Sequence, residues 1–331
     1  CVTGSPAHVR REEVETAAVV TRVAPSFVRF GHFEHFASNG QLDELRALAD
    51  HVVTTHFPEL QDKQGTERYV GLLKEVTQRT AHLMAQWQAV GFCHGVMNTD
   101  NMSILGLTLD YGPFQFLDGF DPQHICNHSD HQGRYAYDKQ PQIAYWNLFC
   151  LAQALMPLIE TQELAMRALE SYKPTFSNAW TEKFLSKLGL HLSELPEQLE
   201  SDTLLLNNLL EILAAEQVDF TVFWRRLSGA VLDSSADALA WRQVADLFLD
   251  QAAWKTWQAR YLDRLNQLNV NQCQERMYKV NPKYILRNHL AESAIQKSKM
   301  GDHSEVETLF KLLKSPYDDQ APFDHYANLD R

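Results

Sequence analysis

The chain has 331 residues, of which 45% are hydrophobic, and a formal net charge of −12. Such a chain can bury a substantial core in more than one packed unit, while its acidic balance argues against a nucleic-acid-binding surface, which normally carries a basic patch. Five scattered cysteines make a poor disulfide framework and indicate a reducing compartment, and no apolar run approaches the roughly 20 residues that a membrane-spanning helix needs. We therefore expect neither a nucleic acid nor a membrane as a partner.

The first half of the chain predicts two amphipathic helices. Residues Cys1 to Pro6 indicate the end of a strand followed by a turn. Apolar residues then recur at helical spacing from Leu42 to Val53, between an Asn-Gly pair and a proline. A longer pattern of the same kind starts near Thr66 and ends at Gly91. This second helix leads the chain straight into the loop that begins at His94.

That loop has the residue types of a kinase-type nucleotidyl or phosphoryl transferase. His94 to Asn101 follows the H-G-x5-N spacing of a loop that supplies a base and a metal-binding amide, and Asp110-Tyr111-Gly112 has the form of a metal-binding D-x-G turn. Residues 103–110 predict two short strands joined by a tight turn, which would bring Asn101 and Asp110 to one cation. Val96 stands where such kinases carry their catalytic aspartate. The nearest carboxylate that could replace it is Asp100.

The second half of the chain is predicted to be helical. An apolar helix over 142–160 is expected to be the central helix of its unit. Further helical patterns follow at 204–213, 220–227, 236–249, 252–268 and 285–294, and a soft boundary is expected within 172–202. The fold class is therefore α+β, predominantly helical.

Each candidate residue also has a structural interpretation. The Asp110 turn could be an ordinary turn after a strand, and His94 is expected to brace the loop backbone rather than carry protons. Arg22 and Arg29 could be ordinary surface cations. Their apolar neighbours indicate partly buried stems, which would need a phosphate or a carboxylate as partner, and we favour phosphate.

The segment His124 to His131 competes as a functional site. Three histidines and Cys126 within it could bind zinc, but their H-x-C-x-H-x2-H spacing matches no common structural zinc site. The segment lies where kinases place their activation loop. A role in binding the acceptor or in regulation is therefore the better hypothesis.

Four ordered blocks resemble the selenoprotein O family: Thr21 to Gly31, His94 to Ser103, Leu109 to Phe114 and Asn281 to Leu290. The resemblance implies a protein-kinase-like fold and transfer of AMP from ATP to Ser, Thr or Tyr hydroxyls of proteins. It implies Asp100 as general base, Asn101 and Asp110 as ligands of Mg²⁺ (or of Mn²⁺ in its place), and Arg22 and Arg29 as phosphate contacts, so that the two arginines and Asp110 bind the nucleotide.

The resemblance also implies a division of the chain. Residues 1–40 would be the end of an N-terminal lobe and the inter-lobe segment, 41–172 a kinase-like catalytic C-lobe core, and 173–331 a helical C-terminal extension. Most of the N-terminal lobe and the family's C-terminal tail, for whose cysteine or selenocysteine Cys126 is a candidate redox partner, are expected to be missing. The location would be cytoplasmic in a bacterium or mitochondrial in a eukaryote. A kinase-type phosphotransferase and an inactive nucleotide- or protein-binding fragment remain alternatives.

Overall fold

Helices dominate the architecture because apolar residues recur at helical spacing through most of the chain. The structure is a computed structural model and describes residues 2–10 and 14–327. Its strands are β1 (Val2–Arg10), β2 (Val14–Val20), β3 (Phe92–Cys93) and β4 (Gln115–Phe116). Its α-helices are α1 (Phe30–Ser38), α2 (Leu42–His56), α3 (Gly65–Val90), α4 (Gln140–Ile159), α5 (Gln162–Leu169), α6 (Tyr172–Lys187), α7 (Pro196–Ala215), α8 (Phe220–Ala230), α9 (Leu239–Ala245), α10 (Gln251–Leu265), α11 (Val270–Val280), α12 (Asn288–Lys299) and α13 (Ser304–Leu312). Short 3-10 helices are η1 (Pro58–Leu60), η2 (Thr99–Asn101), η3 (Tyr137–Lys139) and η4 (Ala321–Ala327).

The first hydrophobic cluster packs helices α1 to α5. The predicted helices α2 and α3 are confirmed, and each turns its apolar stripe toward this cluster. Helix α4 packs against α1, α3 and α5, as expected of a central helix. The stretch Tyr137–Ile159 is nevertheless long and apolar enough to cross a membrane by length and composition, which corrects our expectation that no stretch comes close. Half of its most apolar window is buried, and core helices of water-soluble proteins share this composition.

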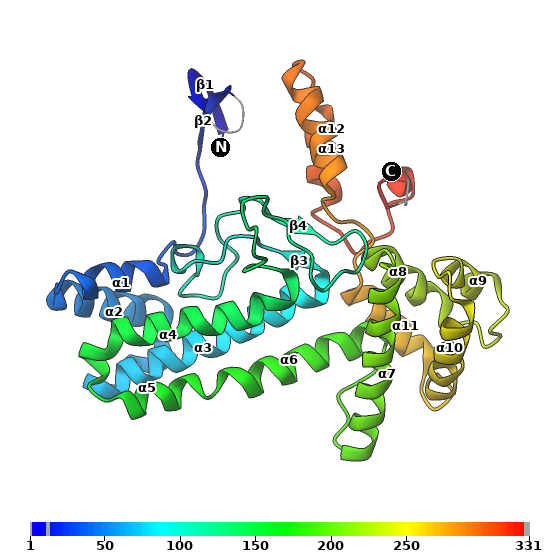
Figure 1. Ribbon diagram of the computed structural model, residues 1–331, viewed down its shortest axis with the longest axis horizontal. Coiled ribbons are helices and arrows are strands. Elements are labelled where there is room, and N and C mark those ends of the chain that lie inside the picture. The colour runs from blue at the N-terminus through cyan, green and yellow to red at the C-terminus, as the bar shows by residue number, and fades with distance from the viewer. Residues whose placement is uncertain (1, 11–13, 328–331) are drawn as a thin grey trace.

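The second hydrophobic cluster packs the C-terminal half of α6 with helices α7 to α11. Helix α6 spans both clusters, since Tyr172 joins the first and Phe184 the second (Figure 1). The sequence patterns missed α6, which tolerates Pro174 because a proline in the first turn removes no helical hydrogen bond. They also placed α12 too early: the prediction began at Ile285, whereas residues 285–287 are not helical and α12 begins at Asn288.

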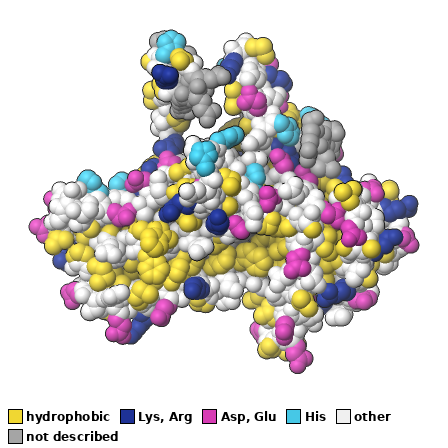
Figure 2. All heavy atoms as spheres, viewed as in Figure 1, with side chains coloured by type: hydrophobic (Ala, Val, Ile, Leu, Met, Phe, Trp, Pro, Cys, Tyr) yellow, Lys and Arg dark blue, Asp and Glu magenta, His cyan; other side chains and the backbone are white. Residues whose placement is uncertain are grey.

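The N-terminal hairpin β1–β2 stands away from the helical body on an extended segment (Figure 1). The predicted turn after the first residues is wrong, because β1 continues to Arg10 with only a register shift between Ser5 and His8. Cys1 lies outside the described residues. Helices α12 and α13 project from the body on the same side (Figure 1). Figure 2 shows a band of hydrophobic side chains across the middle of one face, where the long helices run.

Candidate active site

Strands β3 and β4 bring the two halves of the candidate site together. Helix α3 ends at Gly91, whose φ of +70° lies in the left-handed region that glycine adopts without strain. Strand β3 follows at once and pairs antiparallel with β4, with Phe92 opposite Phe116. The loop that begins at His94 therefore starts beside the segment that follows the Asp110 turn.

His94 braces the loop backbone, as predicted. Its Nε2 lies 2.7 Å from the carbonyl oxygen of Leu109, and its Nδ1 lies 3.3 Å from the backbone N–H of Val96. Because that N–H must donate, Nδ1 is the acceptor and Nε2 carries the proton. The buried ring stacks on Trp87, and burial lowers the pKa of His94. A neutral imidazole with both nitrogens engaged is a structural group and not a proton shuttle.

Asn101 is oriented by the loop that it ends. Its Nδ2 donates to the carbonyl oxygen of Val96 at 2.9 Å, so Oδ1 is left as the free acceptor, with no hydrogen bond recorded among the described residues. Asn147 of α4 holds the same loop by donating to the carbonyl oxygen of Met97 at 2.7 Å. The loop is thus fixed from two sides while one amide oxygen stays unpaired.

Asp100 is exposed, and its carboxylate lies against the first turn of α1. A Cβ added at Gly31 would lie 2.0 Å from Asp100 Oδ1, so only glycine leaves room for this approach. Backbone N–H groups at a helix N-terminus favour a negative charge close by. We did not predict a role for Gly31 from the sequence, although a glycine at the second position of a helix is a signal for close contact.

Both predicted arginines meet Asp110. Arg29 Nη2 lies 2.7 Å from Asp110 Oδ2, and Arg22 Nη1 donates to Asp110 Oδ1 in a short contact. The φ of Asp110 is +57°, in the left-handed region that residues with a side chain seldom adopt. Backbone strain of this kind is found most often at functional sites, where surrounding contacts hold it in place.

Backbone pairing places Arg29 beside the loop. Arg29 forms an isolated antiparallel bridge with Ser103, and the next backbone N–H donates to the carbonyl oxygen of Met102 at 3.0 Å. Met102 pairs in turn with Thr108 across a tight turn at Gly106. The predicted hairpin over 103–110 is therefore present as a turn with one bridge. The expectation of two strands is wrong because the turn itself uses the residues that would have extended the pairing.

Asn101 and Asp110 carry side-chain oxygens of the kind that hard cations bind. Asn101 and Asp110 flank the single bridge across the turn. Asp110 Oδ2 is buried and forms an ion pair with Arg29 without an aligned hydrogen bond, whereas Asn101 Oδ1 has no hydrogen bond among the described residues. Mg²⁺ prefers such oxygens and completes its shell with water and substrate phosphates. Within 2–10 and 14–327 no three His, Cys, Asp or Glu side chains form a metal site, so any cation would rely on these few ligands.

The structure thus brings Arg22, Arg29 and Asp110 into direct contact and places Asp100 and Asn101 next to each other in η2. The arginines meet a carboxylate here. Their contact with phosphate stays a prediction.

The segment His124 to His131 does not converge on a metal. His124 Nε2 lies 3.0 Å from a glutamine side-chain oxygen, and the other two histidines are exposed. Cys126 is buried and donates its S–H to Cys93 Sγ at 3.3 Å, which lowers the pKa of Cys93 and raises that of Cys126. The zinc alternative finds no support in the described residues. The partner of Cys126 in this structure is Cys93, which we did not single out from the sequence.

Comparison with known proteins identifies the family. The family model described as protein adenylyltransferase SelO matches residues 1–314. The chain is 54% identical over 332 residues to the protein nucleotidyltransferase YdiU of Variovorax paradoxus and 56% identical over 330 residues to that of Albidiferax ferrireducens. Each alignment covers 99% of this chain and 65% of the relative, so the chain spans somewhat less than two thirds of the length of these relatives. The YdiU protein of Ralstonia nicotianae is 51% identical over 346 residues. The chain therefore belongs to the SelO family of protein adenylyltransferases.

Proposed function

We propose that this protein is a protein adenylyltransferase that moves AMP from ATP to hydroxyl side chains of other proteins. The observation that carries the proposal is the meeting of Arg22 and Arg29 at Asp110, together with an Asn101 amide oxygen that accepts no hydrogen bond from the described residues. Two guanidinium groups held together at one carboxylate form a site that can bind the charged phosphates of a nucleotide. The family is described as protein adenylyltransferase, which supports AMP as the group that is transferred.

The two arginines differ in their freedom to reach a phosphate. The side chain of Arg29 is 22% exposed and is fixed by backbone pairing, whereas that of Arg22 is 52% exposed and lies on the extended segment before α1. We assign Arg29 a fixed phosphate contact and Arg22 a mobile one. Asn101 and Asp110 would hold Mg²⁺, or Mn²⁺ in its place, which when bound supplies positive charge to the phosphate oxygens.

The transfer step needs a group that accepts a proton. Asp100 takes the proton from the acceptor hydroxyl, whose oxygen forms a bond to the α-phosphorus of ATP. The bond from that phosphorus to the bridging oxygen breaks, and pyrophosphate leaves. Val96 cannot take this part, because its side chain is aliphatic and its backbone N–H is engaged by His94. Asp100 is exposed at the protein surface, where a protein acceptor can reach it.

The test follows the label from ATP that is labelled at either the α- or the γ-phosphate. This chain is incubated with Mg²⁺ and candidate acceptor proteins, and the Variovorax paradoxus relative serves as a control for the assay. Asp110→Asn is the main variant because asparagine tolerates the left-handed backbone that Asp110 adopts. Asp246→Asn is the matched control, because Asp246 is exposed at the end of α9, a helix that packs in the second cluster away from Asp110.

We expect α-label on protein with the unchanged chain and with Asp246→Asn, and none with Asp110→Asn. Label from only the γ-phosphate would make the protein a kinase-type phosphotransferase. Transfer from neither position, with nucleotide binding retained, would leave a binding role and refute the proposal.

A further inference from the structure

A cavity of about 590 Å³ lies apart from the candidate active site. Its walls come from the C-terminal half of α3, the segment around β3 and β4, the C-terminal half of α6, the end of α11 and Tyr317. None of Arg22, Arg29, Asp100, Asn101 and Asp110 lines it. Its volume is in the range of sites that bind small organic molecules.

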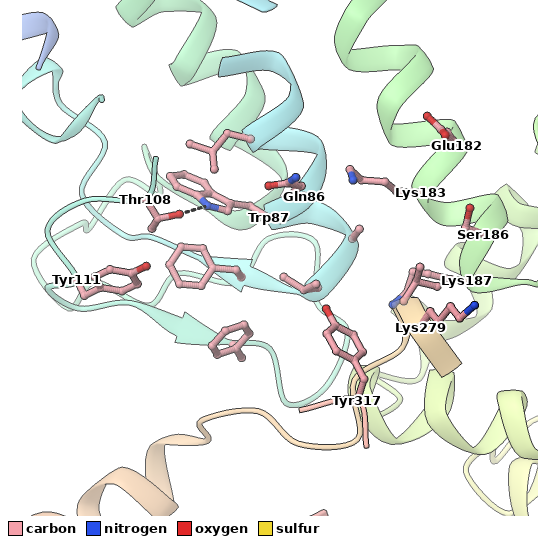
Figure 3. A pocket seen from close by; sticks show the side chains of 16 residues that line it. Gln86, Trp87, Thr108, Tyr111, Glu182, Lys183, Ser186, Lys187, Lys279 and Tyr317 are labelled. Atoms are coloured by element: carbon pink, nitrogen blue, oxygen red, sulfur yellow. Dashed lines mark hydrogen bonds between the residues drawn. The ribbon is translucent and has the colours of Figure 1, made fainter. Parts of the chain in front are cut away.

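The two sides of the cavity differ in chemistry. Trp87 and Tyr111 lie on one side of the cavity, and the lysines lie on the other (Figure 3). Phe92 and Phe116 also line it. Such aromatic surfaces favour a flat apolar molecule. The cavity therefore has an apolar wall for a ring and a basic wall for a charge.

Lys187 is the buried cation of the basic wall. It lies at the end of α6 and is 1% exposed, and its Nζ has no hydrogen-bond or ion-pair partner among the described residues. Among the described residues its amino group contacts two aromatic rings, with Nζ 4.8 Å from the Trp224 centroid and 5.4 Å from that of Phe220. Asn281 donates to the backbone carbonyl of Lys187 at 3.0 Å but leaves its own Oδ1 unpaired. A buried amino group without a hydrogen-bond partner is costly even when it is neutral, so its position at a cavity suits a ligand that supplies the partner.

The other charged groups of the cavity favour an anion. Lys183 and Lys279 also line it, and Glu182 is the single carboxylate of the lining. Burial raises the pKa of Tyr317, so its hydroxyl keeps its proton and can donate. Figure 3 shows the Tyr317 hydroxyl between the aromatic side and the lysine side. One buried lysine in a largely apolar lining suits a single negative charge better than a phosphate dianion, which would need more donors.

We propose that this cavity binds a small aromatic carboxylate, with the carboxylate paired to Lys187 and the ring packed against Trp87 and Phe92. The ligand is distinct from the nucleotide and the protein acceptor of the proposed reaction. Thr108 and Tyr111 line the same cavity and lie on either side of Asp110 in the chain, so the ligand contacts the segment that carries the candidate active site.

Binding should be coupled to uptake of a proton. Burial lowers the pKa of Lys187 to about 7, and pairing with a carboxylate raises it again. At about pH 8 the free side chain is mostly neutral, so each ligand bound should bring close to one proton with it; at about pH 6 the side chain is already charged and uptake should vanish. Glu182, Lys183, Lys279 and Tyr317 face the same cavity, so the measurement needs a control at one of them.

The experiment is calorimetric titration of the whole chain with 2-naphthoate and with its uncharged analogue 2-naphthamide, in two buffers of different ionisation enthalpy. We expect naphthoate to bind at least about tenfold more tightly than naphthamide, because only the carboxylate can pair with a buried cation. Lys187→Met should remove this preference and the proton uptake while leaving naphthamide binding in place. Lys279→Gln, at an exposed position of the lining, should keep both.

Equal binding of the two probes would refute the proposal, as would a preference for naphthoate that survives in Lys187→Met. Proton uptake that is the same at both pH values would also refute it. That comparison uses the unchanged chain, so it decides the matter even if Lys187→Met does not fold. None of these readouts depends on transfer from ATP, so failure here and failure of the proposed function are separate results.

Discussion

Replacement of Lys187 by methionine should stabilise the protein at neutral pH. Lys187 is buried in the second cluster without a hydrogen bond or an ion-pair partner in the described part of the chain, and burial lowers its pKa from 10.5 to about 7. Methionine has a similar length and flexibility and no charge to desolvate. The substitution therefore keeps the packing beside Phe220 and Trp224 and removes the cost of the ammonium group.

The size of the effect follows from the difference in protonation between the two states. In the unfolded chain the lysine has an ordinary pKa, so between about pH 7 and 10.5 the unfolded state binds more protons and stability rises with pH. Over that window the lowered pKa changes the free energy of unfolding by about 5 kcal/mol. This contribution is present above pH 10.5 and is lost as the pH falls to the pKa of the folded state. The two ring contacts favour the charged form by about 1 kcal/mol each, which leaves a net gain of about 3 kcal/mol for the methionine variant at pH 7.

Urea unfolding followed by tryptophan fluorescence at several pH values between 7 and 10 measures the free energy of unfolding and its dependence on pH. The unchanged chain should gain stability over that range, whereas Lys187→Met should be more stable at pH 7 and show a flatter profile. Lys279→Met is the matched control, because Lys279 is exposed on the same lining, and its profile should follow that of the unchanged chain. A methionine variant that is less stable at pH 7, or one that keeps the full slope, would refute the account of Lys187 as an uncompensated buried base.

Three further outcomes are expected from contacts elsewhere. Gly31→Ala should displace the Asp100 carboxylate and reduce AMP transfer by roughly 100-fold, while thermal unfolding changes by no more than about 1 kcal/mol because alanine favours the helix. Arg287→Met should lower the free energy of urea unfolding by about 3 kcal/mol, since it leaves two carboxylates without their shared, nearly buried cation. Treatment with diamide should join Cys93 to Cys126, as seen by mass spectrometry of unreduced peptides, and Cys126→Ser should abolish that product.

The sequence singled out the three residues that the structure brings into contact at Asp110, but it located fewer of the elements that hold them. The arginine pair and the Asp110 turn could be recognised because they combine residue types and spacings that are rare together. Long helices such as α3 could also be predicted, since a periodic apolar stripe closed by Gly91 is a strong local signal. Helix α6 was missed because its apolar residues face two different clusters along its length, so no single stripe runs through it.

Other features depend on contacts between distant segments and leave no local pattern. Arg287 joins the segment after the Asp110 turn to the start of α8 by pairing with Asp118 and Asp219, two residues far from it and from each other in the chain. The pairing of Cys93 with Cys126 likewise appears only when β3 and the histidine-rich segment come together. No local pattern in the sequence marks Lys187 as a buried residue. Only the packing of α8 against the end of α6 buries it.

The charged groups at Asp110 and at Lys187 differ in whether they already have partners of opposite charge. At Asp110 one carboxylate pairs with two arginines, so each guanidinium already has a partner although one positive charge remains in excess. A nucleotide that bound here, as we propose, would exchange this carboxylate partner of the arginines for phosphate. Such an exchange costs little because charges are traded between polar partners. Lys187 has no ion-pair partner in the described part of the chain, so an anionic ligand would form a new ion pair with it and displace none. The cavity should therefore discriminate strongly between an anion and its neutral analogue, whereas the Asp110 site should discriminate mainly by the number and spacing of phosphates.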